Sequence, residues 1–265
     1  MRYLFALMFL FLTILGTTAQ TKIEQLLCEN TSNPLGMGVE KPRFTWVITS
    51  SQGSTMQKAY ELVVKEGKKT VWSTGKVDSE QSVLVEYAGT KLHSNTKYNW
   101  QVRVWDNHGG VSAWSTAAFF HTALFQESDW KAKWISIGFE EDLKTRPVQY
   151  FRKSFVVKKK ITQATAFITS QGMYEAYLNG SRVGDAYLTP GWTSYKTRLQ
   201  YQVYDVTALL HAGDNAAGAM LGNGWFRGTL GWVGNGNLYG KQLALLMQVH
   251  IKYADGTSDF FVTDE

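Results

Sequence analysis

The sequence contains a single cysteine, Cys28, and only five histidines among its 265 residues. One cysteine cannot form an intramolecular disulfide, and neither residue type shows the spacing of a zinc site. The chain also has no Gly-x-Ser-x-Gly segment, which excludes the usual nucleophile elbow of acyl-transfer enzymes. The glycine-rich residues 222–228 lack the Lys-Ser/Thr pair of a phosphate-binding loop, so we expect no nucleotide site there.

Long apolar runs are absent beyond the first residues of the chain. Residues 1–15 form a short basic start and an apolar run, and small residues follow up to Ala19. This pattern predicts a cleaved secretory signal peptide over residues 1–19 and export to the periplasm or the exterior. A membrane span needs about 20 apolar residues. We therefore expect no membrane span in the mature chain.

Charge is scattered along the sequence. The formal net charge is +5, and the densest basic runs, such as residues 158–160, lie between strand-like segments. Such runs are typical of solvated turns, so no nucleic-acid partner is predicted. By contrast, aromatic residues reach 14% and include ten tryptophans. This surplus would suit sugar binding, although sandwich cores and corners also use Trp and Tyr.

Residues 20–127 read as a first β-sandwich domain. Strand-like segments occur at 43–48, 59–64 and 98–105, separated by turn residues. In the third segment the residues Tyr98, Trp100, Val102 and Val104 alternate with polar residues and are predicted to face the core. Short, regular strand spacing predicts about seven strands, and this part resembles fibronectin type III and immunoglobulin-like domains.

Residues 128–265 read as a second, jelly-roll-like β-sandwich, so the whole chain is predicted to be all-β. Asn179-Gly180 follows an alternating strand and predicts a type I′ hairpin turn. Trp130 and Trp134 are expected either between the two domains or in the core of the second. The strand pattern is still running at Glu265, from which we expect an incomplete domain.

The motifs of the second domain together resemble the N-terminal β-sandwich of bacterial α-L-rhamnosidases. They occupy residues 174–185, 190–195, 201–207 and 221–228, and the resemblance runs from about Trp130 to the end. It implies a secreted, multi-domain enzyme that removes terminal α-linked L-rhamnose from plant glycans or glycosides with inversion. It also implies a catalytic α/α barrel, C-terminal to these modules, which no stretch of this chain resembles. No residue here therefore inherits a catalytic role.

The remaining function is recognition of a rhamnose-containing carbohydrate. A sugar needs an apolar platform for its C–H face and polar groups for its hydroxyls. Side chains of these types gather in the loops of the second domain, and the predicted carbohydrate-binding residues are Trp192, Tyr195, Asn223, Trp225, Arg227, Trp232, Asn237 and Tyr239.

No cofactor is predicted to be required. In some relatives a rhamnose-binding module uses calcium, and the resemblance leaves a calcium ion possible in the second domain. The oxygen donors of the needed kind are Asn179, Asp185, Asn223, Asn235 and Asn237.

Two other interpretations stay open. The chain could be a free-standing lectin or adhesin, or a structural spacer whose aromatic residues serve only the core. Several hundred further residues with helical periodicity would favour the enzyme. Carboxylates such as Asp205 and Asp255 lie beside turns and strand ends, where aspartate is ordinarily a turn former.

Overall fold

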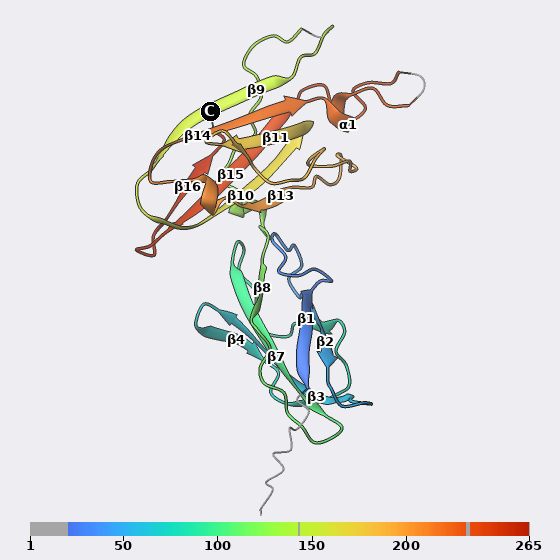
Figure 1. Ribbon diagram of the computed structural model, residues 1–265. Coiled ribbons are helices and arrows are strands. Elements are labelled where there is room, and N and C mark those ends of the chain that lie inside the picture. Colours follow the sequence, from blue (N-terminus) through green and yellow to red (C-terminus); the bar gives the residue numbers. More distant parts are fainter. Residues whose placement is uncertain (1–20, 143, 232–233, 265) are drawn as a thin grey trace, which may run out of the picture. The chain divides into compact units, whose positions relative to one another are not determined.

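A computed structural model of the protein describes residues 21–142, 144–231 and 234–264 (Figure 1). The chain divides into two compact units. One comprises Met1–Ser32, Pro42–Thr90 and Asn99–Phe119, and the other Asn33–Lys41, Lys91–Tyr98 and Phe120–Glu265. The predicted signal peptide lies outside the described residues. Within those residues, none of the helices has the length and apolar character needed to cross a membrane.

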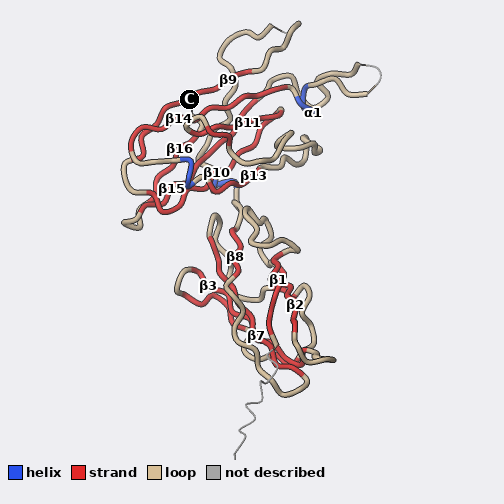
Figure 2. The backbone as a smooth tube through the Cα atoms, viewed as in Figure 1, coloured by secondary structure: helices blue, strands red, loops and turns tan. Residues whose placement is uncertain are grey.

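Strands make up nearly all of the regular structure, as Figure 2 shows, and this confirms the all-β prediction. Eight described strands precede residue 122 and form two sheets, ordered β1-β2-β6 and β4-β3-β7-β8, with β5 paired to β3. Their bounds are β1 Lys22–Cys28, β2 Arg43–Thr49, β3 Gln57–Glu66, β4 Lys69–Ser73, β5 Val77–Asp78, β6 Val85–Glu86, β7 Lys97–Asp106 and β8 Ala118–His121.

Strand β7 shows why this part of the sequence folds as a sandwich. Tyr98, Trp100, Val102 and Val104 are each at most 1% exposed, so the predicted core face is confirmed. Phe44 of β2 packs against Trp100 with ring centroids 4.7 Å apart, which joins the two sheets through aromatic contact.

Two four-stranded antiparallel sheets form the second sandwich, ordered β13-β10-β15-β16 and β12-β11-β14-β9. A one-turn helix, α1 (Gly224–Arg227), follows β14, and the 3-10 turns η1 (Glu127–Asp129) and η2 (Thr207–Leu209) complete the described elements. The strands are β9 Gln149–Val157, β10 Ile161–Gln171, β11 Met173–Leu178, β12 Ser181–Arg182, β13 Gln202–Asp205, β14 Gly213–Gly222, β15 Ala244–Tyr253 and β16 Ser258–Val262.

The second core lies between these sheets. Ala166 and Ile168 of β10 meet Ala176 of β11 and Leu221 of β14 there. The β11–β12 hairpin turns at Asn179 and Gly180 with φ of +50° and +82°, which confirms the type I′ turn.

The outer face of the β10–β15 sheet is covered by the chain itself. Phe167 of β10 is completely buried, and Trp130 and Tyr201 lie against it. Trp130 therefore packs on the outside of this sheet rather than in the core, whereas the Trp134 side chain is 43% exposed. The outer face of this sheet is therefore covered at the centre of β10.

Candidate functional site

The predicted binding residues come from two loops of the second sandwich. One loop joins β12 to β13 and the other joins β14 to β15 through α1. Trp232 lies outside the described residues. Ring contacts and a hydrogen bond connect Trp192, Trp225, Tyr239 and Tyr195, so residues from both loops do converge. Asn223 pairs separately with Arg227, and the Asn237 side chain contacts Arg146.

Trp192 and Trp225 form a stacked pair at the surface. Their ring centroids are 6.1 Å apart and their planes differ by 7°. Trp192 is 57% exposed, and its indole Nε1 donates a hydrogen bond to the Tyr239 hydroxyl at 3.1 Å. The pair presents a broad apolar surface with a polar edge, which suits the C–H face of a sugar ring.

Tyr195 reaches this pair through Tyr239, the hydrogen-bond partner of Trp192. Its ring packs against Phe226 and Tyr239 with centroids 5.3 and 4.9 Å away, and its hydroxyl donates to the Gly191 carbonyl oxygen. Burial raises the pKa of the Tyr195 hydroxyl. We conclude that Tyr195 joins the two loops by packing on Phe226 and Tyr239 and bonding to Gly191.

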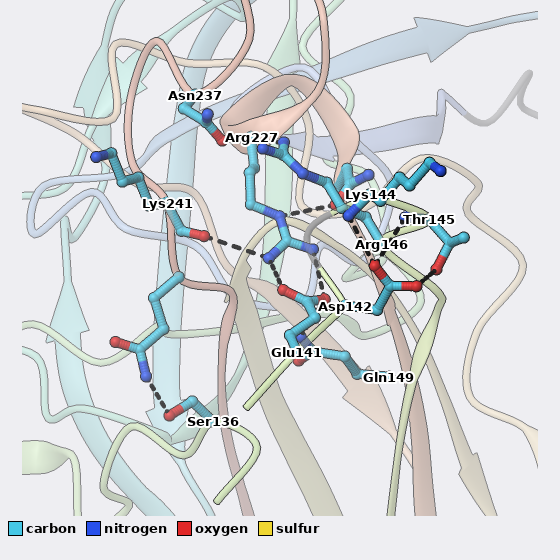
Figure 3. Close-up of polar contacts among 12 residues, drawn as sticks. Ser136, Glu141, Asp142, Lys144, Thr145, Arg146, Gln149, Arg227, Asn237 and Lys241 are labelled. Atoms are coloured by element: carbon cyan, nitrogen blue, oxygen red, sulfur yellow. Dashed lines mark hydrogen bonds and ion pairs between the residues drawn. The ribbon is translucent and has the colours of Figure 1, made fainter. Parts of the chain in front are cut away.

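Arg227 lies in a buried ion pair instead of facing solvent. Its side chain is 2% exposed and that of Glu141 is 10% exposed. Nη1 and Nη2 contact the two Glu141 oxygens at 2.5 and 2.9 Å, while Nε donates to Asn223 Oδ1 at 2.8 Å (Figure 3). Nη1 also donates to the Lys241 carbonyl oxygen. All these donors point into the protein. Through its ion pair with Glu141, Arg227 links α1 to the segment before β9.

The hydrogen bonds from Arg227 hold the pKa of the Glu141 carboxyl below its usual range. Gln149 Nε2 donates to the same carboxylate at 3.1 Å. Glu141 is therefore an ionised structural anion, and it offers no proton for acid catalysis. Sequence reasoning missed this residue because its partner lies 86 positions away.

Asn223 and Asn237 direct their side-chain oxygens toward arginines. Asn223 Oδ1 accepts from Arg227, and Asn237 Oδ1 accepts from Arg146 Nη1 at 3.1 Å. A cation bound at either oxygen would lie beside a guanidinium, so these two predicted calcium donors do not fit the ion. Among the residues that the structure describes, no group of three or more His, Cys, Asp or Glu side chains could hold a metal.

Two glycines set the geometry of the α1 loop. Gly224 has φ of +50°, and a Cβ atom there would lie 2.5 Å from Met173 Cγ. A Cβ at Gly240 would lie 2.3 Å from the Phe226 ring. Neither the turn of helix at Gly224–Arg227 nor these close approaches were predicted, because the sequence signals only turns.

The carboxylates predicted to be turn formers are confirmed in that role at Asp205 and Asp255. Each accepts hydrogen bonds from a threonine two residues later, Thr207 and Thr257. The described loops thus combine an exposed aromatic pair with a buried ion pair.

Comparison with known proteins gives a family match for each half of the chain. The family described as Alpha-L-rhamnosidase N-terminal domain matches residues 159–265, and the family described as Rha78A-like, N-terminal immunoglobulin domain matches residues 23–126. The two matches account separately for the second and the first sandwich.

Proteins that match about nine tenths of this chain are named α-L-rhamnosidases. An α-L-rhamnosidase of Formosa agariphila is 33% identical over 253 residues, covering 90% of this chain and 27% of that protein. One from Alteromonas sp. is 35% identical, covering 88% and 27%. The crystal structure of native α-L-rhamnosidase from Aspergillus terreus has a TM-score of 0.84 at 34% identity, covering 92% of this chain and 29% of that one. The chain thus spans little more than a quarter of the length of these relatives.

Proposed function

We propose that this chain, whose two halves match N-terminal domain families of α-L-rhamnosidases, is the non-catalytic N-terminal part of an exported α-L-rhamnosidase. The parent enzyme hydrolyses terminal α-linked L-rhamnose from plant glycans or glycosides. The observation that carries this proposal is the similarity along about nine tenths of the chain to proteins of that name.

The two domains serve to position a catalytic domain in the parent enzyme. The ionised Glu141 and the turn-forming Asp205 and Asp255 all have structural partners. Paired catalytic carboxylates, one protonated and one ionised, are what glycoside hydrolysis requires. We expect the purified 265-residue chain not to cleave a chromogenic α-L-rhamnoside, and turnover abolished by replacing one of its own carboxylates would contradict this placement.

The stacked Trp192–Trp225 pair is the part of the chain that contacts rhamnose. Rhamnose carries a methyl group in place of a hydroxymethyl group, so one side of its ring is well matched to an exposed indole. The Tyr239 hydroxyl accepts from the indole Nε1 of Trp192 and keeps its own proton for a hydrogen bond to the sugar at the platform edge. Arg227 is not counted among the contacts, because its donors are already satisfied in the interior.

A rhamnose titration followed by tryptophan fluorescence tests this site. We expect a saturable change in the wild type that is lost in Trp192→Ala and in Trp225→Ala. Trp134→Ala is the matched control, since that side chain is 43% exposed and lies outside the pair. An unchanged response in both pair variants would refute the site.

Repeating the titration with calcium and then with a chelator tests the calcium prediction. A response that needs calcium would require donors other than Asn223 and Asn237, whose side-chain oxygens face arginines. Rhamnose binding by a natural full-length protein that shows no rhamnosidase activity would instead support the lectin interpretation.

A further inference from the structure

The outer face of the β12-β11-β14-β9 sheet is open, unlike that of the β10–β15 sheet. Tyr150 and Val156 on β9 are 74% and 58% exposed, whereas Phe167 and Gln248 on the outer side of the other sheet are at most 1% exposed. Figure 1 shows β9, β14 and β11 side by side as one layer of the second sandwich. The open face is therefore available to a ligand.

Strand register places an aromatic ring, a bare glycine and a cation in one row across this face. Gly218 of β14 is opposite Tyr177 of β11 on one side and Arg152 of β9 on the other. In the next row, Met220 lies between Glu175 and Tyr150. Since residues opposite each other on antiparallel strands project to the same face, these side chains surround Gly218.

The small residues of β14 turn this face into a groove of about 450 Å³. Ala216 and Gly218 form its floor, and Tyr150, Arg152 and Tyr177 contribute to its lining. Neighbouring strands are about 4.8 Å apart, so the strands carrying Tyr177 and Arg152 are separated by roughly 10 Å. One sugar ring fits in that width, and the volume lies within the range of small-ligand sites.

Polar side chains beside the groove provide hydrogen-bonding groups for a ligand. The Tyr177 hydroxyl donates to Glu175 Oε2 at 2.8 Å, and Arg182 Nε lies 3.7 Å from the same oxygen. The Glu175 and Arg182 charges offset each other, which leaves Arg152 as the excess charge beside an apolar floor. One cation is too little for a nucleic-acid or phosphate surface, whereas hydroxyls can both donate to Glu175 and accept from Arg152.

We propose that this groove, centred on Gly218, binds a pyranose ring of a neutral glycan. The glycan is the rhamnose-containing one assigned to the tryptophan pair, so the identity of the ligand rests on the proposed function. The groove itself is a separate site on a different surface, because its residues lie on strands β9, β11 and β14 whereas Trp192 and Trp225 lie in loops and α1. The C–H face of the ring lies on Ala216 and Gly218, and its hydroxyls reach the rim.

Gly218→Val provides a steric test. A Cβ at Gly218 meets only the Phe151 carbonyl oxygen, at 3.6 Å, so the side chain fills the groove without disturbing the backbone. Gly222→Val is the matched control on the same strand and face, where a Cβ meets nothing within 4 Å. Tyr150→Ala is a second variant that removes a wall residue exposed to 74% and hence needs no repacking.

The measurement is a two-dimensional amide NMR titration of the 15N-labelled chain with methyl α-L-rhamnopyranoside. We expect saturable shifts at the Gly218 amide, with an affinity at least tenfold weaker in Gly218→Val and Tyr150→Ala but unchanged in Gly222→Val. The Trp192 indole N–H reports the tryptophan pair independently.

The two readouts separate failure of the groove from failure of the proposed function. A silent Gly218 amide overturns the groove, whether or not the indole responds, and so do shifts that persist equally in both groove variants. Shifts at Gly218 with a silent indole support the groove and refute the tryptophan pair.

Discussion

The buried ion pair between Glu141 and Arg227 should hold the α1 loop in place, and its removal gives the largest predicted loss of stability. Glu141→Ala removes both carboxylate contacts to the guanidinium and one to Gln149, and leaves Arg227 with Asn223 Oδ1 and the Lys241 carbonyl oxygen. Breaking a buried pair from one side costs about 3–5 kcal/mol, because the remaining charge loses its compensation away from water. We expect a loss in that range.

The assay is native-state hydrogen exchange, in which the amide protection of each unit gives the free energy of opening of that unit. Amides of β10 and β15 should lose protection in Glu141→Ala, while those of β3 serve as an internal reference in the same sample. Glu140→Ala is the matched control, since Glu140 is exposed and its replacement should change stability by at most about 0.5 kcal/mol.

A double variant separates the charge effect from packing. Glu141→Leu with Arg227→Met replaces both charges by apolar groups, and should recover most of the loss because neither charge is left unpaired. The pH dependence gives a further check. The folded-state pKa of Glu141 is depressed, so its contribution is complete above the ordinary glutamate range and is lost as pH falls through the lowered value. A loss below about 1 kcal/mol in Glu141→Ala, or no recovery in the double variant, would refute this reasoning.

Three further predictions concern single residues. Burial lowers the pKa of His121 to about 4 from 6.5, so this residue should reduce stability by up to roughly 3 kcal/mol as pH drops from 6.5 to 4. Thermal unfolding should show this, and His121→Gln should remove its part of the fall while that of His250, whose pKa burial also lowers to about 4, remains. Gly240→Ala should displace the Phe226 ring, which a Cβ would approach to 2.3 Å, and expose Trp225 to acrylamide quenching. Asn179→Ala removes side-chain hydrogen bonds to Leu209 and Ala216 and should cost about 1–2 kcal/mol in urea unfolding, whereas Ser181→Ala should be neutral.

Local signals in the sequence determined much of the fold. The alternation in residues 98–104 identified the buried face of β7, because a strand places successive side chains on opposite faces. Asn179-Gly180 located a hairpin turn, since both residues tolerate positive φ. The family motifs likewise lie within short stretches of the second sandwich.

Tertiary structure decided what depends on distant partners. Strand β14 is rich in glycine and alanine, residues depleted in strands, and it is held by pairing with β11 on one side and β9 on the other. Gly218 becomes the floor of a groove only because Tyr177 and Arg152 are its neighbours in register.

For the candidate site, too, the sequence determined one part and the tertiary structure the other. By itself the sequence determined that aromatic and amide side chains gather in the loops of the second sandwich, because composition within a loop is a local property. Which of them face solvent was decided by folding. Trp192 stays exposed beside Trp225, whereas Arg227 turns inward because Glu141, 86 residues earlier, is brought within hydrogen-bonding distance and a buried guanidinium requires that partner.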